Sequence, residues 1–243
     1  MKIDLLAFGV HPDDVELSCS GVLLNEKFIG KKTGIIDLTQ GELGTRGTLE
    51  TRYNEAAAAA VILKVDVREN LKMADGFFIN DEIHQKKIIN ILRKYQPEII
   101  ICNAPEDRHP DHGRSASLVN DAAFLSGLLK VETVENGIGQ KPWRPKYVFQ
   151  YIQDKYLKPD FVVDISASFE QKMESVRAYK TQFYDPQSED GNQTYISTPA
   201  FLDGIIARAA MFGKMIGVQY GEGFISKKMI GINNLDSLIQ KNT

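Results

Sequence analysis

Short apolar runs alternate with helical segments through the first half of the chain, and this alternation restricts the possible folds more than any other feature. Strand-like runs lie at residues 3–9, 34–38, 67–71 and 99–102, and helical patterns lie at residues 15–28, 49–63, 81–95 and 113–129. Continuous apolar runs are typical of strands buried on both faces. Strands separated by helices pair in parallel through right-handed crossovers. The sequence therefore predicts an α/β fold, a Rossmann-like three-layer sandwich whose mostly parallel sheet has the strand order 3-2-1-4-5.

The second half of the chain has a less regular pattern. Residues 147–152 and 161–165 predict two further strands, and residues 169–183 and 199–213 predict two helices. A polar, glycine-containing stretch at residues 185–197 predicts a surface loop near the functional site. Nothing in the pattern marks a repeat or a domain boundary, so we expect a single domain with an irregular C-terminal part.

The length of 243 residues is consistent with one substantial domain over residues 1–243. The net charge of −3 gives no reason to expect nucleic acid or an anionic membrane surface as a partner. The chain enters a strand-like run directly after its first residues, and we expect neither a signal peptide nor a membrane span. Cys19 and Cys102 lie far apart in apolar surroundings, which predicts buried, reduced thiols. Together these features predict a cytoplasmic protein.

Three of the four histidines lie in two similar clusters, His-Pro-Asp-Asp at residues 11–14 and His-Pro-Asp-His at residues 109–112. Each cluster directly follows a predicted strand, the first and the fourth. In the order 3-2-1-4-5 these two strands are neighbours, and ligands bind between them at their carboxyl ends. The topology therefore predicts that two segments distant in sequence meet in one crevice.

His11, Asp14 and His112 are the candidate metal ligands. A catalytic zinc needs about three nitrogen or oxygen ligands and one open position for water, and two histidines with one carboxylate meet that demand. We expect one Zn²⁺ per subunit, although Fe²⁺ also suits these ligands. The alternative is that both histidines lie at helix ends and that Asp14 is a helix cap.

Asp13, His109 and Asp111 are the candidate catalytic residues. Asp13 cannot easily share a metal with the adjacent Asp14, so we expect it to act as a general base toward water. Its alternative role is to cap the helix that follows. We expect Asp111 to orient or charge His109, which would stabilise an oxyanion or protonate a leaving amine. Otherwise the pair only closes a proline-containing turn.

A glycine-rich segment at residues 41–47 follows the second strand at the same end of the sheet. It lacks the Gly-Lys-Ser/Thr ending of a phosphate-binding loop. No G-x-G-x-x-G follows the first strand, so a dinucleotide cofactor is not expected. Polar groups of this segment, Glu42 among them, are candidates for binding substrate hydroxyls or carboxylates, and a plain flexible loop is the alternative. Arg52 is a candidate clamp for an anionic group, with a surface salt bridge as its alternative.

Taken together, three segments resemble the PIG-L/LmbE-type zinc N-deacetylases. They are the strand followed by residues 11–14, the segment Asp-Leu-Thr-Gln-Gly-Glu at residues 37–42, and Glu-Asp-Arg-His-Pro-Asp-His at residues 106–112. The similarity covers nearly the whole chain, and neither histidine cluster alone would be specific. Members of this family remove acetyl groups from N-acetylglucosamine conjugates. Within the family, the chain is most similar to the branch that serves bacillithiol biosynthesis, where the substrate is N-acetylglucosaminyl malate.

The resemblance implies that zinc is held by His11, Asp14 and His112, with Asp13 as the base. It also implies roles for four further residues. His109, held by Asp111, would steady the transition state, Arg52 would contact the substrate, and Tyr195 in the polar loop would reach the oxyanion. The implied partner is a small-molecule sugar conjugate, and the implied assembly is a homohexamer.

Two other functions remain open at this point. A metal hydrolase could act on another bond, such as a phosphoester, but many phosphoesterases use two metal ions and the sequence offers ligands for one. A non-catalytic metal- or sugar-binding protein would have no need of proton carriers such as Asp13 and His109 beside the metal ligands.

Overall fold

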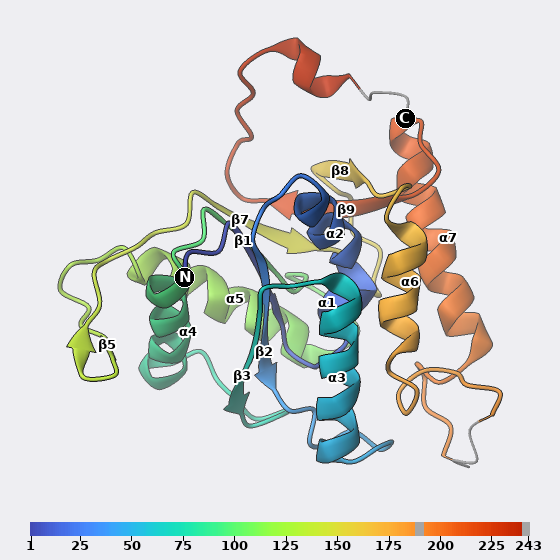
Figure 1. The fold of residues 1–243 in the computed structure, drawn as a ribbon, viewed down its shortest axis with the longest axis horizontal. Helices are drawn as coiled ribbons and strands as arrows, with labels where there is room; N and C mark the ends of the chain where they lie inside the picture. The colour runs from blue at the N-terminus through green and yellow to red at the C-terminus, as the bar shows by residue number, and fades with distance from the viewer. Residues whose placement is uncertain (188–191, 240–243) are drawn as a thin grey trace.

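The computed structural model describes residues 1–187 and 192–239. A sheet of seven strands runs through the molecule in the order β3-β2-β1-β4-β7-β9-β8 (Figure 1). Its strands are β1 (Leu5–Gly9), β2 (Thr33–Thr39), β3 (Val67–Met73), β4 (Ile99–Cys102), β7 (Tyr147–Tyr151), β8 (Phe161–Asp164) and β9 (Gly221–Ser226). The first five strands in this order are parallel, and β9 and β8 extend the sheet in antiparallel fashion. The predicted order 3-2-1-4-5 is confirmed, with β7 as the fifth strand.

Helices cover both faces of the sheet and complete the predicted three layers (Figure 1). They are α1 (Asp14–Ser18), α2 (Ser20–Phe28), α3 (Leu49–Leu63), α4 (Glu82–Tyr95), α5 (Pro110–Leu125), α6 (Phe169–Arg177) and α7 (Pro199–Ile216). Two short strands, β5 (Val134–Glu135) and β6 (Ile138–Gly139), form a separate hairpin, and a 3₁₀ turn spans Leu235–Leu238.

Alternation along the central strand β1 divides the core into two parts. Leu5 and Ala7 belong to the cluster beneath α1, α2, α3, α6 and α7, whereas Leu6 and Phe8 belong to the cluster beneath α4 and α5. Successive side chains of a strand point to opposite faces, so a strand buried on both sides must be apolar throughout. This is why the first apolar run of the sequence predicted a central strand.

Several helix boundaries differ from the predicted ones. The helices predicted over residues 113–129 and 169–183 end at Leu125 and Arg177, and the one predicted over residues 199–213 extends to Ile216. Two further differences have a clear physical cause. The expected helix over residues 15–28 is interrupted at Cys19, where the carboxylate of Glu222 accepts hydrogen bonds from the backbone amides of Gly21 and Val22 and so satisfies the first turn of α2. Helix α5 begins at Pro110 rather than at residue 113. Proline is favoured in the first turn because N–H groups there have no partner within the helix, and proline has no N–H.

Both cysteines are buried and free, as the sequence predicts. Within residues 1–187 and 192–239, none of the helices combines the length and the apolar character that a membrane crossing requires. Of the predicted polar loop at residues 185–197, residues 188–191 lie outside the described part of the chain.

Candidate metal centre and active site

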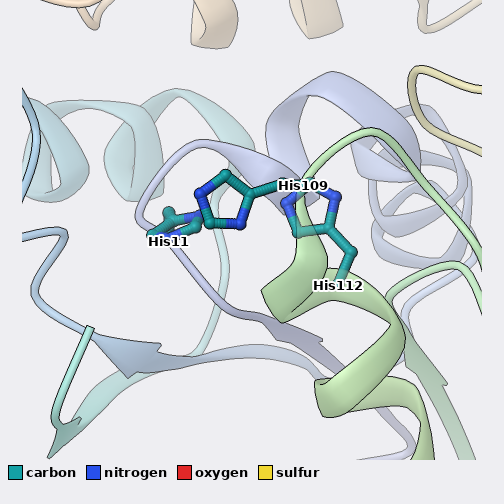
Figure 2. A group of neighbouring side chains, drawn as sticks. All are labelled: His11, His109 and His112. Atoms are coloured by element: carbon teal, nitrogen blue, oxygen red, sulfur yellow. The ribbon is translucent and has the colours of Figure 1, made fainter. Parts of the chain in front are cut away.

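The two histidine clusters meet at the carboxyl ends of β1 and β4, which pair directly in the sheet. His11 lies in the turn between β1 and α1, and His109 and His112 lie at the start of α5 (Figure 2). The ring of His109 is 4.8 Å from that of His11 and 5.4 Å from that of His112, measured between centroids, and the rings of His11 and His112 are 5.9 Å apart. The convergence predicted from the topology is therefore present.

His112 is held between two carboxylates. Its Nδ1 lies 2.6 Å from Oδ2 of Asp107, and its Nε2 lies 3.3 Å from Oδ1 of Asp14. Metal-binding histidines commonly hydrogen-bond a carboxylate through the nitrogen that does not face the metal, which fixes the ring and its tautomer. The contact with Asp107 leaves Nε2 as the nitrogen that faces Asp14.

His11 repeats this arrangement with its two nitrogens exchanged. Its Nε2 lies 2.9 Å from Oδ1 of Asp75, and its Nδ1 lies 3.8 Å from Oδ2 of Asp14. Each of the two imidazoles therefore has a carboxylate on its outer nitrogen and directs its inner nitrogen toward Asp14. Two nitrogens and one carboxylate that face one another are donors of the kind that a catalytic divalent metal ion takes, so these three residues could hold such an ion.

Asp14 is fixed from several sides. One carboxylate oxygen accepts hydrogen bonds from the backbone amides of Val10 and His11 and from the side chain of Asn103, and the other accepts one from Gln153. Burial by itself would raise the pKa of Asp14, but the charge and hydrogen bond of His112, the charge of His11 and the other hydrogen bonds hold it well below its usual range. An ionised, immobile carboxylate is suited to bind a cation.

Two other donor groups lie close by. Ring nitrogens of His11, His109 and His112 all lie within 4.8 Å of one another, and the same holds for one ligand atom each of His11, Asp75 and Asp111. The latter two carboxylates already accept backbone amide hydrogens, from Leu43 and Gly76 respectively. The three overlapping groups share His11, so the chain fits one metal ion at this position.

Metal binding here has to displace protons. Burial opposes the charged form of both histidines, but Asp75 outweighs it at His11 and raises the pKa of that ring. At His112, Asp14 and Asp107 outweigh burial and raise the pKa to about 10. In the metal-free protein His112 is therefore protonated at neutral pH, and the affinity for a metal must increase with pH.

Asp13 is buried beside this group in an unusual backbone conformation. It precedes α1, yet its side chain makes no capping hydrogen bond, and its φ of 137° lies in the region that favours glycine. Oδ2 of Asp13 lies 3.5 Å from Nη2 of Arg52. Burial raises the pKa of Asp13 to about 7, although the charge of Arg52 opposes the rise. A strained carboxyl group that titrates near neutral pH is typical of a general base.

Asp13→Asn is expected to stabilise the metal-free protein at pH 8. The folded-state pKa of about 7 lies above the ordinary 3.8, so the aspartate's stabilising contribution is complete below pH 3.8 and is lost as the pH rises through 7. Asparagine removes this cost and also tolerates positive φ well. Thermal unfolding should show a midpoint higher by several degrees at pH 8. The gain should shrink toward pH 5, and an equal gain at both values would contradict the explanation.

His109 is held differently from the expectation. The carboxylate of Asp111 accepts hydrogen bonds from the backbone amide of Gly76 and, at 2.5 Å, from Arg114, whereas the backbone amide of Asp111 donates to Nδ1 of His109 at 3.3 Å. Burial lowers the pKa of His109, and His11 and His112 lower it further. The ring is therefore neutral at pH 7, and because Nδ1 accepts a hydrogen bond, its proton is on Nε2.

The three predicted substrate contacts occupy different places. Arg52 and Tyr195 line a cavity of about 320 Å³ that also contains the histidines and Asp13, whereas Glu42 is not part of its wall. The carboxylate of Glu42 accepts the backbone amide of Asp75 at 2.8 Å, so it supports the loop that carries this residue. Tyr195 is 55% exposed and donates from its hydroxyl to Asp154.

The glycine-rich segment makes room for Arg52. Gly41 has a φ of +66°, and a Cβ at this position would collide with the guanidinium. Nη1 of Arg52 donates to the carbonyl of Gly41 at 2.9 Å, and Nη2 donates to that of Pro12 at 3.3 Å. The guanidinium thus joins the loop after β2 to the turn that contains Asp13.

Four polar residues that hold His11, His112 or Asp14 in place were not among the predicted ones, namely Asp75, Asn103, Asp107 and Gln153. Each lies close behind the carboxyl end of a parallel strand, after β3, β4, β4 and β7 respectively. That position was the signal available in the sequence, because all parallel strands deliver their following residues to the same edge. Asp107 also lies within the second histidine motif.

Comparison with known proteins agrees with this fold and site. The model of the family PIG-L, described as GlcNAc-PI de-N-acetylase, matches residues 6–123, which include both histidine clusters. Diacetylchitobiose deacetylase of Thermococcus kodakarensis is 28% identical over 229 residues, which are 90% of this chain and 81% of that protein.

Two solved structures are similar over nearly the whole chain. The conserved protein TT1542 from Thermus thermophilus has a TM-score of 0.84 and 34% identity, covering 95% of this chain and 98% of its own. The N,N'-diacetylchitobiose deacetylase from Pyrococcus horikoshii, in complex with an inhibitor, has a TM-score of 0.78 and 25% identity, covering 92% of this chain and 83% of its own. With both histidine clusters inside the matched region, the chain belongs to the PIG-L family of de-N-acetylases.

Proposed function

We propose that this protein is a metal-dependent N-deacetylase that hydrolyses the acetamide of an N-acetylglucosamine conjugate to a free amine and acetate. The observation that carries the proposal is the pair of imidazoles, each fixed by an outer carboxylate and facing Asp14, with the buried Asp13 beside them. The deacetylases of diacetylchitobiose among the relatives act on an N-acetylated sugar, which supports the choice of bond.

The proposed cofactor is one Zn²⁺ per subunit on His11, Asp14 and His112, with Fe²⁺ as the alternative metal. A bound divalent ion of this kind polarises a carbonyl and lowers the pKa of a coordinated water to roughly 7. The nitrogen-rich donor set supports zinc or iron over magnesium or calcium, which prefer oxygen ligands.

Asp13 is the proposed general base. It accepts a proton from the attacking water as the new carbon–oxygen bond forms, and Arg52 holds it in position from 3.5 Å. A carboxyl group with a pKa of about 7 can also return that proton. When the carbon–nitrogen bond breaks, Asp13 therefore delivers the proton to the departing amine, and water has been added across the amide.

His109 is proposed to stabilise the negative charge that develops on the acetamide oxygen. The neutral ring carries its one proton on Nε2 and so can donate a hydrogen bond to the oxygen. Because the pKa of His109 is lowered, the ring does not carry a second proton at neutral pH that it could give to the departing amine. The Asp111 backbone amide fixes the ring, and the Asp111 carboxylate fixes the turn around it. Tyr195 is a further candidate contact to the substrate.

The proposed substrate is N-acetylglucosaminyl malate, as in bacillithiol biosynthesis, and the proposed location is the cytoplasm. A homohexamer is proposed from the resemblance to the family. Large apolar side chains that are strongly exposed in the single chain support association of copies, among them Tyr53 and Val61 on α3, at 74% and 77%, and Phe77, at 76%.

The decisive experiment measures acetate release by protein loaded with Zn²⁺ or Fe²⁺ and by metal-free protein. The substrates are N-acetylglucosaminyl malate, N,N'-diacetylchitobiose and N-acetylglucosamine. We expect acetate and free amine in equal amounts, with the malate conjugate preferred and the metal-free protein inactive. No acetate from any of the three substrates with either metal would overturn the proposal.

A further inference from the structure

We infer that Arg208 is a specificity-determining residue, whose guanidinium binds a carboxylate in the part of the substrate attached to the sugar. The inference rests on the proposed function and extends it to a residue on α7. Arg208 lines the same cavity as Asp13 and the three histidines. A substrate with its acetamide at Asp13 and a carboxylate at Arg208 would span this cavity.

The other charged groups of the cavity wall have partners within the protein. Asp13 lies 3.5 Å from Arg52, and Asp154 lies 3.0 Å from Arg108. Asp75 and Asp107 hold His11 and His112, respectively, and Asp14 lies between these two rings. Arg46 donates to the backbone carbonyls of Thr181 and Asn192. Each carboxylate in the wall thus already lies beside an arginine or an imidazole of the protein.

Arg208 has a different environment. Its Nη2 donates to the backbone carbonyl of Leu17 at 3.2 Å, and among residues 1–187 and 192–239 no carboxylate lies within 4.0 Å of its nitrogens. The carboxylates that act on it, those of Asp154, Asp107 and Glu222, do so from longer range. Burial lowers the pKa of Arg208, so its charge is incompletely compensated within the folded chain.

Arg208 is half-buried, and a partly desolvated cation without an ionic partner carries a cost that a ligand anion would reduce. The planar guanidinium carries five N–H donors in a geometry that matches a carboxylate, and only one contact, to Leu17, is made within the described chain. Leu17 lies three positions after Asp14 in α1, a rise of about 4.5 Å along the helix. A carboxylate at Arg208 is therefore close enough to belong to a substituent of the sugar that is being deacetylated.

The test combines a binding and a kinetic measurement on Arg208→Gln and Arg208→Lys, with Lys214→Gln as the control. Lys214 is an exposed residue of the same helix and lies outside the cavity wall, so its replacement changes the net charge equally. Binding of L-malate and of its uncharged dimethyl ester is measured calorimetrically on metal-free protein. Turnover is measured on the metal-loaded protein with N-acetylglucosaminyl malate and with the uncharged methyl glycoside of N-acetylglucosamine.

We expect wild type to bind L-malate and not the ester. Arg208→Gln should weaken malate binding about 10- to 100-fold and lower the ratio of kcat/KM for the malate conjugate to that for the methyl glycoside by a similar factor. Arg208→Lys should fall between wild type and the glutamine variant, and Lys214→Gln should match wild type.

An equal loss of kcat/KM on both substrates, or equal binding of malate and its ester by wild type, would overturn the inference. The ester comparison needs only wild type, so it can overturn the inference even if a variant fails to fold. If wild type released no acetate, the proposed function would fail, while malate binding would still test Arg208 directly.

Discussion

Asp13→Asn will lower kcat by roughly 10²–10⁴-fold, the usual contribution of a positioned proton carrier, and will leave the bound metal in place. Asparagine has nearly the same shape as aspartate, so the position 3.5 Å from Arg52 can still be filled. It cannot accept a proton from water, however, and the attacking oxygen then has no base. Acetate release should be measured together with the metal content of the same preparation.

The control for this variant is Asp81→Asn, because both aspartates stand at the N-cap position of a helix. Asp81 accepts a hydrogen bond from the backbone amide of His84 and caps α4, whereas the side chain of Asp13 makes no such bond to α1. If Asp13 mattered only as a helix cap, both variants would keep their turnover, since asparagine is an equally good cap. Turnover of Asp13→Asn within tenfold of wild type would exclude it as the base.

The central part of the fold could be predicted because its signals are local. Helix α3 and strand β4 have the predicted boundaries, since Thr48 caps the helix through the amide of Thr51 and the strand is a short, fully apolar run. The break between α1 and α2 could not be predicted in this way. It depends on Glu222, a residue about 200 positions away, whose carboxylate is paired with the buried Lys172.

The site was predictable to the extent that it follows from topology. The sequence placed His11 and His112 at neighbouring strand ends, and the structure brings their rings together around Asp14. It did not reveal which acids hold the rings, because Asp75 and Asp107 come from different strand ends and their pairing depends on side-chain geometry. For the same reason the partner of Asp111 was not the expected one.

The charge state of His109 could not be predicted from the residue pattern alone. An Asp two positions from a His suggests an ion pair, and the sequence therefore favoured a charged imidazole. In the folded chain the carboxylate of Asp111 is engaged by Gly76 and Arg114, and two further histidines surround the ring. Burial and these neighbours lower the pKa of His109. Proximity in sequence thus predicted that Asp111 contacts His109, but not that the contact is made by the backbone amide or that the imidazole is neutral.

Asp14→Asn is expected to weaken metal binding by more than about 100-fold, whereas His109→Gln should keep the metal and lose turnover. Asp14 faces the inner nitrogens of both His11 and His112, so its charge is central to the donor set. Loss of an outer partner of a metal ligand already costs roughly 10- to 100-fold in affinity, and loss of a ligand should cost more. Metal content after dialysis against a graded chelator would measure both effects.

The comparison of these two variants decides between the overlapping donor groups at this position. Ring nitrogens of His11, His109 and His112 lie within 4.8 Å of one another, so a site of three histidines is a geometric alternative. In that site His109→Gln would release the metal and Asp14→Asn would retain most of it, because amide and carboxylate accept the same hydrogen bonds from Asn103 and the backbone. His84→Gln, which changes the fourth histidine outside the cavity wall, should alter neither metal content nor turnover. The reverse pattern would reassign the third ligand from Asp14 to His109 and leave the oxyanion without its proposed donor.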